Sequence, residues 1–477
     1  MIESAIKQKC NSSDQDEAIM SDNITYSMLT DMLAALDLSG DTASRVTFDG
    51  SDSLPSCFPV SELAAASIGA AATAVSELVG LYSTVPPVSV SYRLASLWFT
   101  WSIRPQGWEM LNPWDGLAGD YKTRNGWIKL HTNAPHHRAA ALSVLGCEPS
   151  REAVADIVKT WCGDELEEAI VAAGGCAARL RSVEDWAAHP QGEAVSAEKL
   201  ILWDTPGKRM ANEWQPSPAR PLSGLRVLDL TRVLAGPVAT RFLAGFGADV
   251  LRIDPPGWDE PGVIPEVTLG KRCARLDLKT PSGRNVFSEL LNKADILVHG
   301  YRSDALEEIG FGTAARQAVR PGLIDISLDA YGHSGPWARR RGFDSLVQFS
   351  SGIAGTGMDW RSADAPFSLP VQALDHATGY LLAAAAVRGV IAKSTGAGPI
   401  SARLSLARTA KLLVDHKGSP SNARFQPLMD EDFGTTVEQT DWGPALRLLP
   451  PVNIAGTPMN WTRPAIKLGS NEAVWLG

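Results

Sequence analysis

The chain has 477 residues, of which 44% are hydrophobic and 20% are charged. This length exceeds the usual range of a single domain and predicts two or three compact units with a sizeable core. The composition argues against intrinsic disorder, and the formal net charge of −9 argues against nucleic acid or an anionic membrane as the main partner. An anionic small ligand stays compatible with local groups of basic residues.

The first residues of the chain indicate the cellular compartment, and the cysteines indicate whether disulfide or metal sites are expected. Residues 1–23 are polar and lack a signal-peptide pattern, and no apolar run of membrane-spanning length is free of charge. We therefore expect a cytoplasmic protein with no membrane partner. The six cysteines show no metal-ligand spacing, which predicts neither a disulfide framework nor a metal site. The adjacent His136 and His137 are interpreted as part of a solvated loop.

A stretch rich in proline and polar residues, 202–222, predicts an interdomain linker. Beyond it, apolar runs alternate with helix-like segments. This alternation predicts a parallel sheet with right-handed crossovers, hence a doubly wound, Rossmann-like α/β lobe. The predicted strands are 225–230, 248–253, 295–299 and 323–327, and the predicted helices are 238–246, 281–293 and 303–309.

Ligands of such sheets bind at the carboxyl ends of the strands. The segments 233–236, 300–302 and 331–336 follow predicted strands, so we expect them on one rim. The glycine-rich segment 352–357 neither follows a first strand nor opens a helix with an acidic residue about 20 positions later. We interpret it as a flexible loop.

Two parts of the chain resemble each other. Residues 58–72 are similar to 369–385, and residues 88–95 are similar to 400–407 at almost the same offset. This repetition suggests tandem descent from one ancestral unit. In the first copy, Ala64 takes the place of Asp375.

Asp375 is the first candidate for a nucleophile. It lies where an extended segment becomes a helix, beside small residues that let a bulky substrate approach. Aspartate is also a favoured N-cap residue, whose side chain accepts a backbone N–H bond at a helix start. The residues around it are compatible with both roles.

Ordered blocks from Pro221 to about Leu412 resemble the family III CoA-transferases, the CaiB/BaiF group. The matching blocks are 221–237, 247–257, 276–283, 294–302, Gly342 to Asp344 and the segment around Asp375. The resemblance implies that Asp375 attacks an acyl-CoA thioester and forms an aspartyl anhydride. An aspartyl-CoA thioester follows, which passes CoA to an acceptor acid. Covalent steps of this kind avoid a high-energy free intermediate, and an aspartate is normally ionised near neutral pH.

The resemblance also implies the ligands and partners. CoA enters as the acyl-CoA donor, with a carboxylic acid as acceptor and no metal, and a homodimer is expected. The positions that match the family's CoA contacts are Val233, Leu276, Gly300, Tyr301 and Arg302. A helix N-terminus and an arginine suit the phosphates of CoA.

Two positions depart from the family pattern. Pro255 replaces an arginine that is common after the second strand, and Gly300 replaces the usual asparagine. Both departures affect contacts with phosphate.

Residues 106–201 resemble the family's smaller α+β lobe, which here precedes the large lobe instead of following it. The resemblance therefore implies a shortened tandem fusion. Its five expected segments are an N-terminal helical region that echoes the large lobe (1–105), the small lobe (106–201), the linker (202–222), the large lobe (223–412) and a linker with a C-terminal tail (413–477).

Two alternatives stay open. Racemases of the same family pair the aspartate with a histidine just before the Asp of a Gly-His-Asp motif, and here that position is Phe343. Two-base proton transfer would then need His333 or His376 as the second base. A member that binds CoA esters without catalysis is the other alternative.

Overall fold

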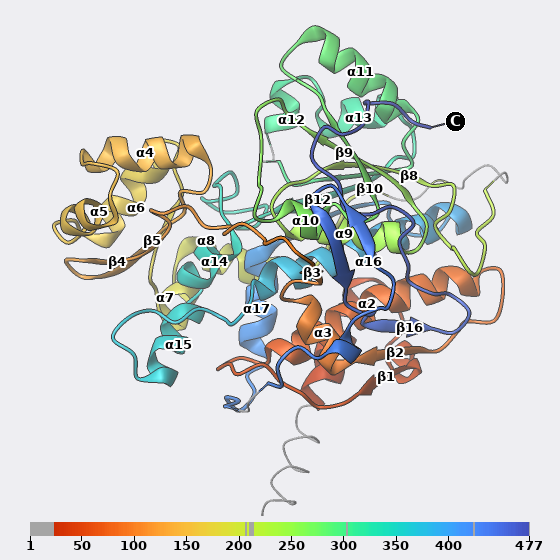
Figure 1. The fold of residues 1–477 in the computed structure, drawn as a ribbon, viewed down its shortest axis with the longest axis horizontal. Helices are drawn as coiled ribbons and strands as arrows, with labels where there is room; N and C mark the ends of the chain where they lie inside the picture. The colour runs from red at the N-terminus through yellow and green to blue at the C-terminus, as the bar shows by residue number, and fades with distance from the viewer. Residues whose placement is uncertain (1–22, 206–207, 209–213, 302–303, 423–424, 477) are drawn as a thin grey trace, which may run out of the picture.

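The structure, a computed structural model, describes residues 23–205, 208, 214–301, 304–422 and 425–476. It is a mixed α/β protein with one large, mostly parallel sheet, so the predicted α/β class is confirmed. A smaller group of helices and strands stands at one side of the large sheet, as Figure 1 shows.

The large sheet has seven strands, six of them parallel, and β7 pairs antiparallel with β13 at one edge. Numbered by their order in the chain, the parallel strands lie side by side as 3-2-1-4-5-6, so the strand order reverses between β8 and β11. Ligands of open parallel sheets bind at such a reversal. Across the sheet the strands are β10 (Lys271–Arg275), β9 (Asp249–Asp254), β8 (Arg226–Leu230), β11 (Ile296–His299), β12 (Ile324–Asp329), β13 (Ser401–Ser405) and β7 (Leu202–Trp203).

All four predicted strands of this sheet are present, with ends shifted by one or two residues. Strand β10 was not predicted, because it begins with two charged residues, Lys271 and Arg272, which are uncommon in a buried strand. Burial of Lys271 is possible because its ammonium group forms an ion pair with Asp229. Strand β7 lies inside the predicted linker, so the first residues of that segment belong to the sheet edge.

Helices cover both faces of the large sheet. Helices α9 and α16 pack on one face together with Val227 and Val298, whereas α11 packs on the other with Leu228 and Leu297. The remaining helices of this part connect strands or extend from them. Their bounds are α9 (Ala235–Gly245), α10 (Ile264–Val267), α11 (Pro281–Asn292), α12 (Ala305–Glu308), α13 (Thr313–Val319), α14 (Asp344–Ser350), α15 (Ile353–Arg361), α16 (Ala373–Thr395) and α17 (Leu406–Asp415).

The glycine-rich segment 352–357 is not a loop, so that prediction is wrong. Gly352, with φ +84°, precedes α15, which runs through the remaining glycines. Gly357 is required by packing, since a Cβ there would stand 2.0 Å from the carbonyl oxygen of Phe367. The glycines therefore allow close approach within a helix, which a sequence pattern does not distinguish from flexibility.

The smaller group contains a three-stranded antiparallel sheet with helices against it. His136 and His137 lie in the first turn of α4 and the side chain of His137 is buried, so the solvated-loop interpretation is wrong. Pro135 is the first residue of α4, a position that proline favours because its backbone angle suits the start of a helix. The elements are β4 (Gly119–Thr123), β5 (Gly126–Leu130), β6 (Ala177–Arg179), α4 (Pro135–Leu145), α5 (Arg151–Val158), α6 (Gly163–Ala172), α7 (Val183–Ala187) and α8 (Pro190–Ala197).

The N-terminal region lies against a helix that covers the large sheet. Its long helix α2 (Val60–Gly80) packs along α16. Helix α2 is long and apolar enough to cross a membrane, but 89% of its most apolar stretch of 18 residues is buried inside the protein. The remaining helices are η1 (Gly40–Arg45), α3 (Tyr92–Trp98) and η2 (Asp430–Asp432). One small sheet contains β1 (Val46–Asp49), β2 (Val88–Ser91) and β16 (Val452–Ile454). Another contains β3 (Ile103–Pro105), β14 (Glu438–Thr440) and β15 (Gly443–Arg447).

The internal resemblance has a structural counterpart. The order β1, α2, β2, α3 parallels β12, α16, β13, α17, with parallel pairing of the two strands in each case. The residues before the two long helices adopt nearly the same backbone angles, φ −74° and ψ 71° at Pro59, and φ −77° and ψ 65° at Gln372. Asp375 is the third residue of α16, and the third residue of α2 is Glu62. The position equivalent to Asp375 is therefore Glu62, and not Ala64. Tandem descent stays a prediction.

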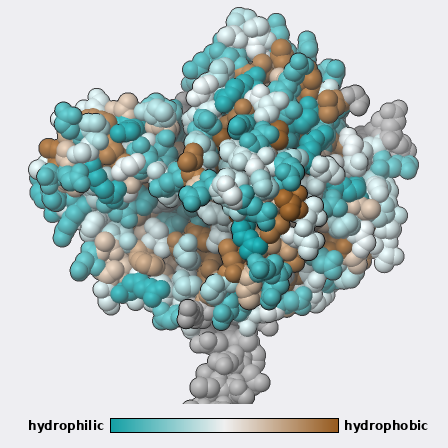
Figure 2. Space-filling model, viewed as in Figure 1, coloured by the Kyte–Doolittle hydropathy of each residue, from teal (hydrophilic) through white to brown (hydrophobic). Residues whose placement is uncertain are grey.

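The space-filling view gives the character of one face of the molecule. Figure 2 shows mainly hydrophilic residues on this face, with hydrophobic residues in separate groups. We see no single continuous apolar surface in this view.

Candidate active site

A cavity of about 780 Å³ lies at the carboxyl ends of the strands of the large sheet. Residues at or just after the ends of β8, β9, β10, β11 and β12 line it, and the start of α4 and a loop at 340–343 close another side. The cavity includes the place where the strand order reverses, which is the expected ligand position in an open parallel sheet.

Four of the five predicted CoA contacts line this cavity, namely Val233, Leu276, Gly300 and Tyr301. Arg302 lies outside the described residues. The predicted rim segment 331–336 does not line the cavity. Its backbone turns toward α8 instead, where the N–H groups of its central residues donate to a carboxylate oxygen of Glu198.

Val233 has a strained backbone with φ +62°, which is uncommon for a β-branched residue. Its N–H donates to Oε1 of Glu260 at 3.0 Å. Strain of this kind is found at ligand sites, where surrounding structure fixes the conformation. Because Glu260 takes the N–H, the contact that Val233 offers to a ligand is its side chain or carbonyl group.

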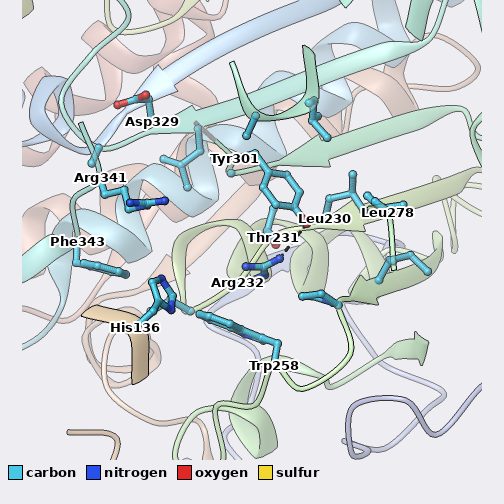
Figure 3. Close-up of a pocket in the computed structure, with 18 of the residues that line it drawn as sticks. His136, Leu230, Thr231, Arg232, Trp258, Leu278, Tyr301, Asp329, Arg341 and Phe343 are labelled. Carbon is cyan, nitrogen blue, oxygen red and sulfur yellow. Dashed lines mark hydrogen bonds between the residues drawn. The ribbon is translucent and has the colours of Figure 1, made fainter. Parts of the chain in front are cut away.

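Arg232 is a cavity residue that the sequence analysis missed. Its guanidinium lies over the ring of Trp258 at 4.5 Å and over that of Tyr301 at 5.1 Å, and it donates to the Tyr301 hydroxyl at 3.0 Å. Figure 3 shows Arg232 between the two rings. A stacked guanidinium is held in place yet keeps donors for a phosphate or carboxylate.

Basic side chains near the cavity have two different roles. Arg252 is fully buried and forms an ion pair with Asp254, so it supports the sheet instead of a ligand. Arg340 and Arg341, in contrast, line the cavity. Arg340 also donates to Oε1 of Glu167 at 2.9 Å, which connects this loop to helix α6.

Asp375 is the third residue of α16 and lines the cavity with only 6% of its surface exposed. It does not cap this helix, because the N-cap position belongs to Gln372 and no side-chain cap bond is formed there. The capping interpretation is therefore wrong. The carboxyl group is placed at a helix N-terminus, where the helix dipole favours a negative charge.

The missing cap is supplied from another helix. Asp344, the first residue of α14, accepts the N–H groups of Leu374 at 2.8 Å and of Asp375 at 3.1 Å with one carboxylate oxygen. Its other oxygen accepts the side-chain amide of Gln348. Asp344 is 1% exposed, so these donors replace the water that its charge would otherwise bind. This arrangement fixes the start of α16 and with it the position of Asp375.

The two carboxyl groups do not titrate alike. Burial, followed by the charge of Asp344, raises the pKa of Asp375 well above its usual range. Burial raises the pKa of Asp344 to about 6, although the N–H donors of Asp375, Gln348 and Leu374 oppose this rise. Since the donors point at Asp344, we assign the charge to Asp344 and the proton to Asp375 when the pair binds one proton. The expectation of an aspartate with an ordinary pKa is wrong.

A raised pKa in the folded state also affects stability. The folded protein binds a proton at Asp375 that the unfolded chain has lost above the ordinary carboxyl pKa, so the free energy of unfolding falls as pH rises through this range. Asp375→Asn removes this effect. We expect the variant to melt about 2 °C higher than the wild type at pH 8 and to show a smaller difference at pH 4.5. Calorimetry at both pH values checks this, and an equal or lower Tm of the variant at pH 8 would contradict it.

Neither predicted substitute for a second base lies in the cavity lining. Burial lowers the pKa of His376 to about 3, and its ring stacks on Phe99 at 5.0 Å. The Nε2 atom of His333 lies 2.9 Å from the carbonyl oxygen of Leu404. Both histidines are therefore interpreted as packing residues. Phe343 lines the cavity and stacks on the ring of His131 at 3.6 Å.

The composition of the site suits an organic ligand with negative charge. In the described ranges, 23–205, 208, 214–301, 304–422 and 425–476, no group of His, Cys, Asp and Glu side chains has the arrangement of a metal site. The cavity combines apolar strand ends with Arg232, Lys279, Arg340 and Arg341. Apolar walls with a few convergent charges suit a long ligand that carries phosphate groups.

These features define an α/β protein with a carboxyl pair at the ligand cavity of its parallel sheet. Residues 222–419 match the sequence model of CoA-transferase family III.

Similar proteins include a "Probable fatty acyl-CoA transferase Rv3272" of Mycobacterium tuberculosis, 33% identical over 189 residues, which cover 37% of this chain and 48% of the relative. A human succinyl-CoA:glutarate CoA-transferase is 34% identical over 194 residues, 38% of this chain and 44% of the relative. A crystal structure of Rv3272 from M. tuberculosis aligns with a TM-score of 0.39 and 29% identity, covering 42% of this chain and 58% of that chain. The chain thus spans about half the length of the curated relatives that it matches.

Proposed function

We propose that this protein transfers CoA from an acyl-CoA to a carboxylic acid, with Asp375 as the covalent nucleophile. The observation that carries the proposal is the placement of Asp375 in the cavity at the start of α16, where Asp344 holds the backbone. The match of residues 222–419 to the family model and the names of the relatives support the same reaction class.

The proposed reaction has two halves. A carboxylate oxygen of Asp375 attacks the acyl carbon of the donor, the carbon–sulfur bond breaks, and CoA leaves as a thiolate. The thiolate then attacks the side-chain carbonyl of Asp375, which releases the donor acid and leaves an aspartyl-CoA thioester. The acceptor carboxylate repeats these steps in reverse and departs as the new acyl-CoA, so that Asp375 is restored and no proton is consumed.

The raised pKa of Asp375 suits this role. A carboxylate of higher pKa is a stronger nucleophile once it has lost its proton, because its negative charge is less stabilised. The neighbouring Asp344 contributes to this activation through its charge.

We extend the proposal to the whole molecule. The large sheet with its helices is the Rossmann-like CoA-binding lobe, and the elements between β4 and α8 form the second lobe. The protein acts in the cytoplasm as a homodimer, and its chain arose by shortening of a tandem fusion. Size-exclusion chromatography with light scattering checks the dimer.

The proposed activity is tested with isotopically labelled substrates. Purified protein is incubated with an acyl-CoA of known acyl group and a second, labelled carboxylic acid, and the CoA esters are separated by mass spectrometry. We expect labelled acyl-CoA to appear without an equal release of free CoA. Absence of exchange over a panel of monocarboxylic and dicarboxylic acids, with CoA binding retained, would favour the non-catalytic alternative.

A racemase remains the competing enzyme of the family. It requires a second base, and Phe343 stands at the position of the family histidine. Incorporation of solvent deuterium at the α-carbon of an acyl-CoA, without any acceptor acid, would establish this alternative.

We expect Arg232 to bind the phosphate groups of CoA. Arg232→Ala should raise the Kd for CoA by about 10-fold, because it removes a charge-assisted donor that the rings of Trp258 and Tyr301 hold in place. Isothermal titration with CoA measures the effect. Arg124→Ala removes an exposed arginine outside the cavity lining and serves as the control. Equal affinities of both variants would contradict this assignment.

A further inference from the structure

His137 is a buried histidine without a hydrogen-bond partner. Its side chain is 4% exposed, and neither ring nitrogen has a partner among the residues that the structure describes. Its ring lines the cavity. Buried polar atoms are almost always bonded in folded proteins, so an unpaired imidazole in a cavity wall marks a place where a ligand atom completes the bond.

The position of His137 relates it to Asp375. The ring of His137 meets that of Phe343 edge-on with 5.9 Å between centroids, and the next residue, Asp344, accepts the N–H of Asp375. His137 and Asp375 both line the cavity, and the adjacent residues Phe343 and Asp344 contact one of them each.

The start of α4 adds to the polarity of this wall. His137 is the third residue of the helix, and the N-cap residue, Ala134, offers no side-chain cap. The positive end of the helix dipole is therefore close to the cavity. Figure 3 shows the neighbouring His136 beside Phe343 and Arg341 at this side of the cavity.

The protonation state of His137 limits what it can do. Burial, followed by the nearby His136 and Arg341, lowers the pKa of His137 to about 4. Its imidazole is therefore neutral near pH 7, with one ring nitrogen that carries hydrogen. A neutral imidazole of low pKa is a weak base but a good hydrogen-bond donor to a carbonyl oxygen that gains negative charge.

We propose that His137 donates a hydrogen bond to the carbonyl oxygen of the acyl thioester while Asp375 attacks the acyl carbon. This inference rests on the proposed function. The new bond joins an oxygen of Asp375 to the acyl carbon, and the carbonyl oxygen carries negative charge only until the carbon–sulfur bond breaks and its electron pair leaves with sulfur. His137 keeps its proton throughout, so it stabilises charge without transferring hydrogen.

The kinetic test compares three variants. His137→Phe removes both nitrogens but keeps a ring against Phe343, whereas His137→Gln restores an N–H donor. His131→Phe replaces a buried histidine that stacks on Phe343 but does not line the cavity, and it controls for packing. We expect His137→Phe to lower kcat about 100-fold with little change in KM, His137→Gln to recover part of the loss, and His131→Phe to retain wild-type kcat.

A kcat of His137→Phe within about threefold of the wild type would overturn the inference, as would a loss confined to KM. The melting temperatures of the variants identify any general loss of folding. A wild type that transfers no CoA would instead refute the proposed function, and a second measurement then decides about His137.

That measurement needs no turnover. Acetyl-CoA labelled with ¹³C at its carbonyl carbon is bound to Asp375→Asn, and isotope-edited infrared spectroscopy records the carbonyl band. We expect the band to move to lower frequency on binding, and the shift to disappear when His137→Phe is added to Asp375→Asn. A shift that is equal with and without His137 would overturn the proposed contact, whether or not the wild type is active.

Discussion

Asp375→Asn is expected to lower CoA transfer by roughly four orders of magnitude or more, because the covalent route loses its nucleophile. Asparagine has nearly the same volume, so α16 and the cavity should keep their shape. The Kd for CoA should stay within about threefold of the wild type, since the aspartate contacts the reacting group and not the nucleotide. Labelled-acid exchange gives the rate, and isothermal titration gives the affinity.

The chain offers a matched control for this variant. Glu62 is the third residue of α2, as Asp375 is of α16, and it is also buried, but it does not line the cavity. Glu62→Gln should therefore retain transfer. Activity of Asp375→Asn close to that of the wild type would refute the role of Asp375. A loss of similar size in Glu62→Gln would show that the two substitutions act through folding.

Asp344→Asn is expected to have the second largest effect, and to change the pH dependence as well as the rate. The substitution removes the charge that helps to raise the pKa of Asp375, so Asp375 should lose its proton at lower pH. The acidic limb of the kcat profile should then move down by about one pH unit. The maximal rate should fall about 10- to 100-fold, because the amide holds the start of α16 less firmly.

The pH profile separates this account from a simpler one. Asp329 also lines the cavity, and burial raises its pKa to about 8. An acidic limb that moves in Asp329→Asn but not in Asp344→Asn would show that Asp329 governs the rate. A reduced rate of Asp344→Asn with an unchanged limb would leave Asp344 only a structural role.

The parts of the fold that could be predicted are those where local pattern and burial agree. Strands β8, β9, β11 and β12 of the large sheet are mostly apolar runs, and their ends were predicted to within two residues. Strand β10 and helix α15 were not predicted, since each depends on a distant partner. Lys271 is buried only because Asp229 neutralises it, and Gly357 fits only because Phe367 lies against it.

In the candidate site, too, the features that depend on residues distant in the sequence could not be predicted. Asp375 was found because the order of motifs around it resembles a known family, although its pKa could not be anticipated. That pKa depends on burial and then on the charge of Asp344, which is 31 positions away and accepts the backbone N–H of Asp375. His137 lies in α4, far from Asp375 in the sequence, and the adjacent pair of histidines suggested a loop. The pair of adjacent histidines was noted in the sequence, but only as part of a solvated loop.

The account depends most on covalent participation of Asp375, and trapping of the intermediate tests this most directly. Wild-type protein is incubated with an acyl-CoA and hydroxylamine, and its intact mass and peptides are measured. We predict a hydroxamate at Asp375 that requires acyl-CoA and is absent from Asp375→Asn. Active transfer with an unmodified Asp375, or with the hydroxamate at another carboxylate, would contradict the account.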